Sequence, residues 1–223
     1  MSSIDALSPN INKEDSIVVQ SSTIKSLAHS MGFFACGIAK AAPVDKAVAQ
    51  KYRKWLENGE EASMAYMTNY LEKRLDPQLL VPGVRSIVSL ALNYAPAQQL
   101  PKGEYQIAAY ALGLDYHDLM KQKMRELAIK ITEQWQLPKQ EEGEEPSVRC
   151  FCDTAPVLER YWAQKAGLGW VGRNHQLIIP HAGSMFFLGE IFLPFDVDVY
   201  DEAMSNRCGS CHRCIDACPT RAI

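Results

Sequence analysis

Apolar residues recur with helical spacing in several segments of the chain. In residues 116–135 large apolar side chains return every three or four positions, which predicts an amphipathic helix with one buried face. The positions that form this face are Met120, Met124, Leu127, Ile131 and Trp135. Helices are also predicted over residues 15–31, 44–58, 60–73 and 156–166.

Short runs rich in β-branched, aromatic and other apolar residues predict strands between these helices. They cover residues 33–39, 85–92, 148–152, 176–180 and 184–193. The last two runs flank His181-Ala182-Gly183, which predicts a hairpin. The mixed order of strands and helices indicates an α+β fold, a mixed α/β layered sandwich. Residues 1–14 are expected to be loose, and residues 138–147 to form an acidic surface loop.

Composition narrows the class of protein. Of the 223 residues, 47% are apolar and 22% are charged, as in an ordinary globular protein with a sizeable core. No apolar run approaches the roughly 18 residues that span a membrane, and no secretory signal is evident, so we expect a cytoplasmic protein. The net charge of −3 gives no support for nucleic-acid binding, and any RNA contact would need a local basic patch.

Four of the seven cysteines lie close together near the end of the sequence. Cys208, Cys211, Cys214 and Cys218 have the spacing C-x2-C-x2-C-x3-C, and Pro219 follows, which is typical of bacterial ferredoxins. Four thiolates also suit zinc, but zinc sites usually use two separated pairs. One continuous run closed by proline therefore predicts a 4Fe-4S cluster.

The fourth cysteine of such a run ligates the other cluster in two-cluster proteins. On that rule Cys218 serves a second cluster whose remaining ligands are absent, and the sequence is expected to be a truncated form that is catalytically incompetent alone. A single cluster held by all four cysteines stays open. The predicted domains are residues 1–200, and 201–223 as the N-terminal part of an incomplete ferredoxin-like 4Fe-4S domain.

The other three cysteines are expected to be core residues. Cys150 and Cys152 alternate within a predicted strand and so face the same side of a sheet. A lone C-x-C lacks further ligands nearby, and Cys36 stands alone. Small apolar packing is therefore preferred to a metal role for Cys36, Cys150 and Cys152.

Three longer motifs precede the cysteine run: Asp153-Thr-Ala-Pro-Val-Leu-Glu159, Ala166-Gly-Leu-Gly-Trp-Val-Gly-Arg-Asn174 and Gly183-Ser-Met-Phe-Phe-Leu-Gly-Glu190. In content and order they resemble the epoxyqueuosine reductase family. Shorter segments such as Asp115-Tyr-His117 agree, and the resemblance covers roughly residues 20–223. One departure is Leu112, where relatives commonly carry arginine.

The resemblance implies a function. Those enzymes convert epoxyqueuosine at the tRNA wobble position to queuosine, passing two electrons through two 4Fe-4S clusters to cobalamin. It implies tRNA and a cellular electron donor as partners, and we expect a monomer without membrane contact. Two alternatives stay open, a ferredoxin-like electron carrier and a corrinoid-binding module without tRNA chemistry.

By match to the family motif, Asp153 is the acid that protonates the departing epoxide oxygen. The physical alternative is a helix cap, because Asp153 stands at a predicted strand-to-helix junction before Pro156. Asp115 is expected to cap the helix over residues 116–135, with Tyr116 and His117 bordering the site.

The resemblance implies that residues 1–200 form the cobalamin-binding and catalytic domain, and it assigns a cobalamin-binding segment within this domain. Its residues are Gly167, Gly169, Trp170, Gly172, Arg173 and Asn174, with Ser184 as a further contact. Glycines would let the backbone approach a flat macrocycle closely. The alternative for these glycines is an ordinary helix stop followed by a tight turn.

Overall fold

The computed structural model describes residues 19–98, 100, 101, 103–135 and 148–223. Four strands form the central sheet in the order β1-β2-β6-β3, and every neighbouring pair is antiparallel. The strands are β1 (Ala35–Lys40), β2 (Ser86–Asn93), β3 (Arg149–Phe151) and β6 (Phe186–Leu193). The central strands β2 and β6 are long and apolar, as expected for strands covered on both faces.

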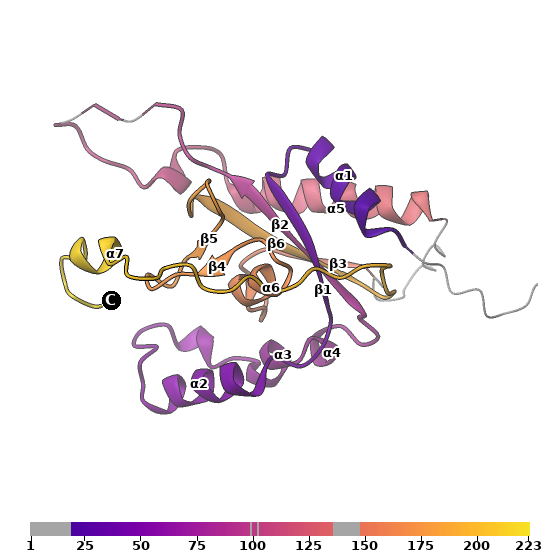
Figure 1. Cartoon of the computed structure of the whole chain (residues 1–223), viewed down its shortest axis with the longest axis horizontal. Coiled ribbons are helices and arrows are strands. Elements are labelled where there is room, and N and C mark those ends of the chain that lie inside the picture. The colour runs from indigo at the N-terminus through magenta and orange to yellow at the C-terminus, as the bar shows by residue number, and fades with distance from the viewer. Residues whose placement is uncertain (1–18, 99, 102, 136–147) are drawn as a thin grey trace, which may run out of the picture.

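Helices cover both faces of this sheet (Figure 1). On one side lie α1 (Ser21–Ser30) and α5 (Tyr116–Gln134), and on the other lies α6 (Glu159–Lys165). Three more helices continue the second side, namely α2 (Lys46–Glu57), α3 (Leu71–Leu75) and α4 (Pro77–Leu80). The mixed α/β layered architecture expected from the sequence is therefore confirmed.

Each side has its own apolar core. Met120, Met124, Leu127 and Ile131 of α5 are completely buried against the sheet, which confirms the predicted helix and its buried face. Trp162 of α6 fills the core on the opposite side. Cys36, Cys150 and Cys152 pack in or against the first core, so their expected role as packing residues is confirmed.

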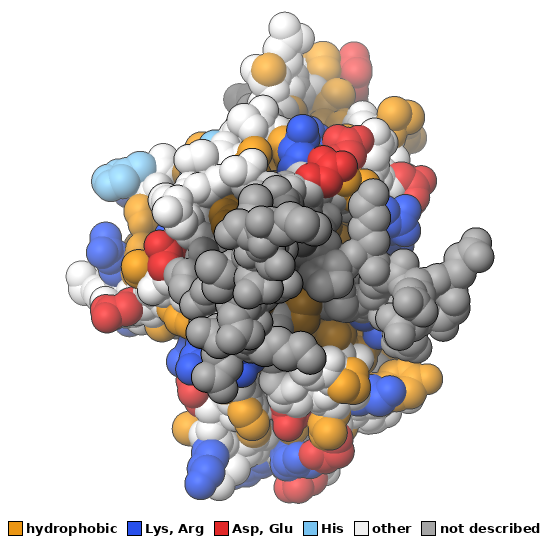
Figure 2. Space-filling view, turned by 90° about the vertical axis from the view of Figure 1, so that its right-hand side faces the viewer, with side chains coloured by type: hydrophobic (Ala, Val, Ile, Leu, Met, Phe, Trp, Pro, Cys, Tyr) orange, Lys and Arg blue, Asp and Glu red, His pale blue; other side chains and the backbone are white. Residues whose placement is uncertain are grey.

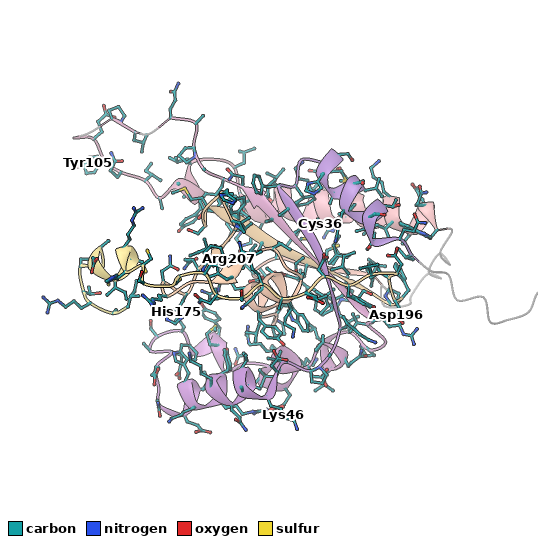
Figure 3. All side chains as sticks on the ribbon, in the orientation of Figure 1. Cys36, Lys46, Tyr105, His175, Asp196 and Arg207 are labelled. Atoms are coloured by element: carbon teal, nitrogen blue, oxygen red, sulfur yellow. The ribbon has the colours of Figure 1, made fainter. Side chains whose placement is uncertain are left out.

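Smaller elements complete the fold. A two-stranded sheet joins β4 (Trp170–Val171) to β5 (Leu177–Ile178), and two 3-10 turns are η1 (Ala65–Met67) and η2 (Ala109–Ala111). An extended segment then leads to α7 (Arg213–Asp216), away from the central sheet (Figure 1). Tyr105 lies at the tip of another projecting segment, between β2 and α5 (Figure 3).

Two predictions about secondary structure were wrong. Residues 60–73 are not one helix, because the backbone turns into the left-handed region at Gly59, Ala62 and Tyr70, leaving only η1 and the start of α3. Residues 176–180 and 184–193 do not pair as a hairpin. Instead β5 pairs with β4 and β6 pairs with β2 and β3, and a single bridge joins Ile179 to Gly183.

Other predictions need smaller corrections. The first helix begins at Ser21 rather than residue 15, because Val19 instead makes a parallel bridge with Val197. The predicted boundary after residue 200 stays a prediction, although Asp201 is itself bound to β1 through the N–H and carbonyl of Ile38. Residues 1–14 and 138–147 lie outside the described residues.

Among the residues that the structure describes, no helix is both long and apolar enough to cross a membrane. The face shown in Figure 2 carries basic and acidic side chains interspersed around atoms that are not described. On its described part, neither sign of charge forms a continuous area, in keeping with the small net charge of −3.

Candidate active site

An open cavity of about 490 Å³ lies where the ends of β2, β3 and β6 meet α5, α6 and the β4–β5 loop. This volume falls within the usual range for ligand sites. Its lining combines aromatic rings with acidic and hydroxyl groups, among them Tyr94, Tyr116, Asp153, Glu159, Ser184 and Phe187. The family-derived acid, Asp153, therefore lines a cavity together with Ser184.

Asp153 lies two residues after the end of β3 and has a left-handed backbone, with φ of 56°. The hydroxyl of Tyr116 donates a hydrogen bond to its Oδ2, and Nε2 of His117 lies 3.6 Å from the same oxygen. Helix α6 begins only at Glu159, and the residue at its N-cap is Leu158. The alternative in which Asp153 caps this helix is therefore wrong, because its carboxyl faces α5 instead.

The start of α5 fixes the groups that meet Asp153. The Asp115 carboxylate accepts the backbone N–H of His117 at 2.9 Å, which confirms the predicted helix cap and lowers the pKa of Asp115. The Tyr116 ring stacks on Phe187 with centroids 4.0 Å apart. Burial, followed by the bond to Asp153, raises the pKa of Tyr116, so its hydroxyl stays a donor.

Two glutamates stand behind Asp153. Oε1 of Glu159 accepts the backbone N–H of Asp153 at 2.5 Å, and burial raises the pKa of Glu159 to about 7. Glu190 in β6 is completely buried, and among the described residues neither of its carboxyl oxygens has a hydrogen-bond partner. Burial raises its pKa well above the ordinary value, so Glu190 is held as the neutral acid.

Sequence reasoning assigned no role to these glutamates. Each of them ends a family motif, and Glu190 interrupts the otherwise apolar strand Phe-Phe-Leu-Gly-Glu-Ile-Phe-Leu. A single carboxyl inside such a strand is the signal that could have identified Glu190. A buried acid costs stability, so it is seldom present unless it has a role. The position of Glu159 beside Asp153 depends on the bend before α6, which periodicity does not reveal.

The glycines of the predicted cobalamin segment meet close structural constraints. Gly167 ends α6 with φ of 74°. A Cβ on Gly169 would lie 2.1 Å from the carbonyl oxygen of Ile178, so this glycine permits the close approach of β4 to β5. A Cβ on Gly172 would meet the side chains of Ile178 and Asn174. The helix-stop and tight-turn alternative accounts for these positions, and cobalamin contact by them stays a prediction.

Arg173 contacts the cysteine segment rather than the cavity lining. Its guanidinium donates to the carbonyl oxygens of Cys211 at 2.6 Å and Gly209 at 2.7 Å. Asn174 accepts the N–H of Gln176 within the turn at 3.2 Å, and Trp170 lies half-buried in β4. Arg173 thus attaches the loop that carries Cys208 and Cys211 to the β4–β5 hairpin.

The four clustered cysteines are free thiols, of which Cys211 is exposed and the others are half-buried. Within the described part of the chain, no three Cys, His, Asp or Glu side chains are gathered as they would be around a metal ion. A hydrogen bond from the Thr220 side chain lowers the pKa of Cys218 to about 7, and the backbone of Arg173 lowers the pKa of Cys208. Thiols with this tendency fit an iron–sulfur donor set.

The buried cysteines behave in the opposite way. Burial raises the pKa of Cys36 to about 12 and that of Cys150 to about 11. Both therefore stay protonated near neutral pH, which suits packing and disfavours metal ligation. This contrast in pKa separates Cys36 and Cys150 of the core from Cys208 and Cys218 of the cysteine run.

Replacing Arg173 with alanine is expected to lower the iron bound per chain several-fold after anaerobic reconstitution with iron and sulfide. The variant loses two charge-assisted hydrogen bonds, each worth about 1.5–3 kcal/mol, that order the loop around Cys208 and Cys211. Colorimetric iron analysis measures the change. The control is Arg207→Ala, which removes the arginine immediately before Cys208. Equal iron content in the two variants would contradict the role of Arg173.

Comparison with known proteins identifies what this chain is similar to. The family model described as epoxyqueuosine reductase QueG, DUF1730, matches residues 74–154. The epoxyqueuosine reductase of Cellulophaga algicola is 43% identical over 203 residues, a match that covers 91% of this chain and 63% of that protein. The chain thus spans less than two thirds of the length of this curated relative.

Solved structures give the same family. The epoxyqueuosine reductase of Streptococcus thermophilus is 28% identical with a TM-score of 0.75, over 89% of this chain and 52% of that one. A crystal structure of an epoxyqueuosine reductase with a tRNA-Tyr epoxyqueuosine-modified tRNA stem loop matches with 26% identity and a TM-score of 0.71, over 90% and 52% of the two chains. By sequence and by structure, therefore, the chain is similar over most of its length to members of the epoxyqueuosine reductase family.

Proposed function

We propose that this chain carries the reductase site that removes the epoxide oxygen of epoxyqueuosine in tRNA, yielding queuosine. The reaction takes two electrons and two protons, breaks both carbon–oxygen bonds of the epoxide, leaves a carbon–carbon double bond between its two carbons and releases the oxygen as water. The observation that carries the proposal is Asp153, held by Tyr116 at the edge of an aromatic-lined cavity. A proton donor is needed there because an alkoxide is a poor leaving group.

The residues of the cavity fit a corrinoid in chemistry. The rings of Tyr94 and Phe187 have centroids 4.6 Å apart, and the Tyr116 ring stacks on Phe187 as well. These three rings offer a flat apolar surface. Ser184 adds a hydroxyl to the same lining. These residues would hold cobalamin, with the segment from Gly167 to Asn174 as further predicted contacts. Bound cobalamin, once reduced, would supply the two electrons that open the epoxide.

The chain's own groups perform the proton chemistry. Asp153 delivers a proton to the departing oxygen, and Tyr116 fixes the orientation of its carboxyl by donating to Oδ2. His117, 3.6 Å from that oxygen, is a second polar group on the same side. Stacking of Tyr116 on Phe187 fixes the donor, so the carboxyl meets substrate in one orientation.

Cys208, Cys211, Cys214 and Cys218 would hold iron–sulfur clusters in a ferredoxin-like segment that receives electrons from a cellular donor. The substrate would be tRNA, and a tRNA substrate implies that the protein acts in the cytoplasm. Because the net charge is −3 and the face in Figure 2 has no continuous basic area on its described part, we expect tRNA to be bound through a local basic patch on another face.

The test is anaerobic reconstitution with iron, sulfide and cobalamin of two samples, this 223-residue chain and a full-length curated relative for comparison. Each sample receives a chemical reductant and a tRNA stem loop that carries epoxyqueuosine. Queuosine detected by mass spectrometry of the nucleosides supports the proposal. Corrin absorption without queuosine would favour a corrinoid-binding module. Iron–sulfur absorption without a bound corrinoid would favour an electron carrier.

A further inference from the structure

The backbone of Asp153 lies in the left-handed region, which residues other than glycine adopt only occasionally, although aspartate and asparagine do so more often than the rest. A φ of 56° at such a residue costs of order 1 kcal/mol or more, so surrounding contacts must maintain it. The loop between β3 and α6 supplies two short internal bonds, from Thr154 N–H to the Cys152 carbonyl and from Val157 N–H to the Ala155 carbonyl. Neither of these two bonds involves the backbone N–H or the side chain of Asp153.

The N–H of Asp153 is bound by the side chain of Glu159, with 2.5 Å from the nitrogen to Oε1. Glu159 is the first residue of α6, and Trp162 and Ala163 in the same helix are buried in the core. A residue in an exposed loop is therefore bound to a rigid element. On the opposite side, the carboxyl of Asp153 is bound by Tyr116 at the start of α5.

We propose that Glu159 is a positioning residue, which holds the Asp153 backbone in its left-handed conformation so that the Asp153 carboxyl meets Tyr116 and the cavity. The consequence for catalysis rests on the function proposed above, whereas the structural part does not. Without the Oε1 acceptor, the Asp153 N–H loses its bond to α6. The bond from Tyr116 to the carboxyl must then oppose the unfavourable φ of Asp153 without that support, and we expect the carboxyl to leave its position.

The charge of Glu159 adds a signature that a purely structural residue would lack. Burial, together with the nearby Asp153 carboxylate, raises the pKa of Glu159 to about 7. Below pH 7 Glu159 is neutral, and above it the carboxylate accepts the Asp153 N–H more strongly, so the hydrogen bond strengthens as pH rises. The other titratable or charged groups that face Glu159 or its partner Asp153 are Cys152, Glu190, Arg74, Arg160, Tyr116 and His117.

The first experiment follows the backbone amide of Asp153 by NMR in the chain as it stands. In the wild type this amide signal should move downfield with a midpoint near pH 7. Glu159→Gln keeps an oxygen acceptor but cannot ionise, so the transition near pH 7 should vanish while the amide stays protected. Glu159→Ala loses the acceptor, and hydrogen exchange at Asp153 should accelerate at least tenfold.

The second experiment measures turnover in the reconstituted protein. Glu159→Ala should lower kcat ten- to a hundredfold with little change in KM, because substrate still binds but the acid is misplaced. Glu159→Gln should restore most of the activity, and Glu133→Ala, an exposed glutamate of α5, is the matched control. Absent turnover in the wild type would overturn the proposed function and leave the NMR result to decide the role of Glu159.

Two outcomes would overturn the inference itself. One is an Asp153 amide that exchanges equally slowly in the wild type and in Glu159→Ala. The other is a transition near pH 7 that persists unchanged in Glu159→Gln. Either would mean that the loop holds Asp153 without the glutamate.

Discussion

Replacing Asp153 with asparagine is expected to lower kcat for epoxyqueuosine reduction by about 10²–10⁴-fold, the usual contribution of a general acid. Asparagine keeps an oxygen that accepts the Tyr116 hydroxyl but has no acidic proton to deliver. The side chain of Asp153 is 45% exposed, so the Asp153→Asn substitution should leave folding and cofactor content unchanged. Nucleoside mass spectrometry after single turnovers measures the loss.

The matched control is Asp118→Asn, which changes an exposed aspartate in the first turn of α5. It should reduce turnover less than twofold. Corrinoid absorption and iron content are measured on both variants, so that a loss of cofactor is not mistaken for a loss of proton transfer. If Asp153→Asn turned over at the wild-type rate, another group would have to protonate the departing oxygen.

Replacing Gly37 with alanine is expected to cost about 3 kcal/mol of unfolding free energy or more. A Cβ at this position in β1 would lie 1.9 Å from the carbonyl oxygen of Ala166 and 2.7 Å from Cδ1 of Leu168. The first obstacle is backbone at the end of α6, so no rotation of a side chain relieves the clash, and the helix must move off the sheet. Urea unfolding followed by circular dichroism measures the change.

Gly113→Ala is the control for this experiment. A Cβ on Gly113 meets nothing within 4 Å, and its backbone lies outside the left-handed region, so stability should change by less than about 0.5 kcal/mol. For Gly37→Ala, a loss of about 3 kcal/mol in a chain of this size corresponds to a Tm that is lower by roughly 6–12 °C. Equal midpoints for the two variants would show that α6 does not press on β1 as the structure has it.

The sequence predicted elements whose burial repeats regularly. Helix α5 was predicted well because Met120, Met124, Leu127 and Ile131 follow the helical period and face one apolar layer. The strands β2 and β6 were found as apolar runs, but their partners were not, because pairing between distant segments has no local signal. Residues 60–73 have helical spacing, yet left-handed turns interrupt them.

The candidate site was predictable only in part. Asp153 and Ser184 were found through the motifs, and both line the cavity. The contact of Arg173 with the cysteine loop could not be read from the sequence, because it depends on how residues after β6 return to the hairpin. Glu159 and Glu190 were missed because their importance comes from burial beside Asp153, which spacing does not encode.

The β4–β5 hairpin links two regions that perform separate tasks. Gln176, just before β5, and Leu177, its first residue, line the cavity. Arg173, near the other end of the same turn, holds the loop of Cys208 and Cys211. The distance between any redox centre on that loop and the cavity is thereby fixed. Because electron tunnelling weakens steeply with distance, a change that loosens this short turn would slow electron delivery without altering either terminus of the route.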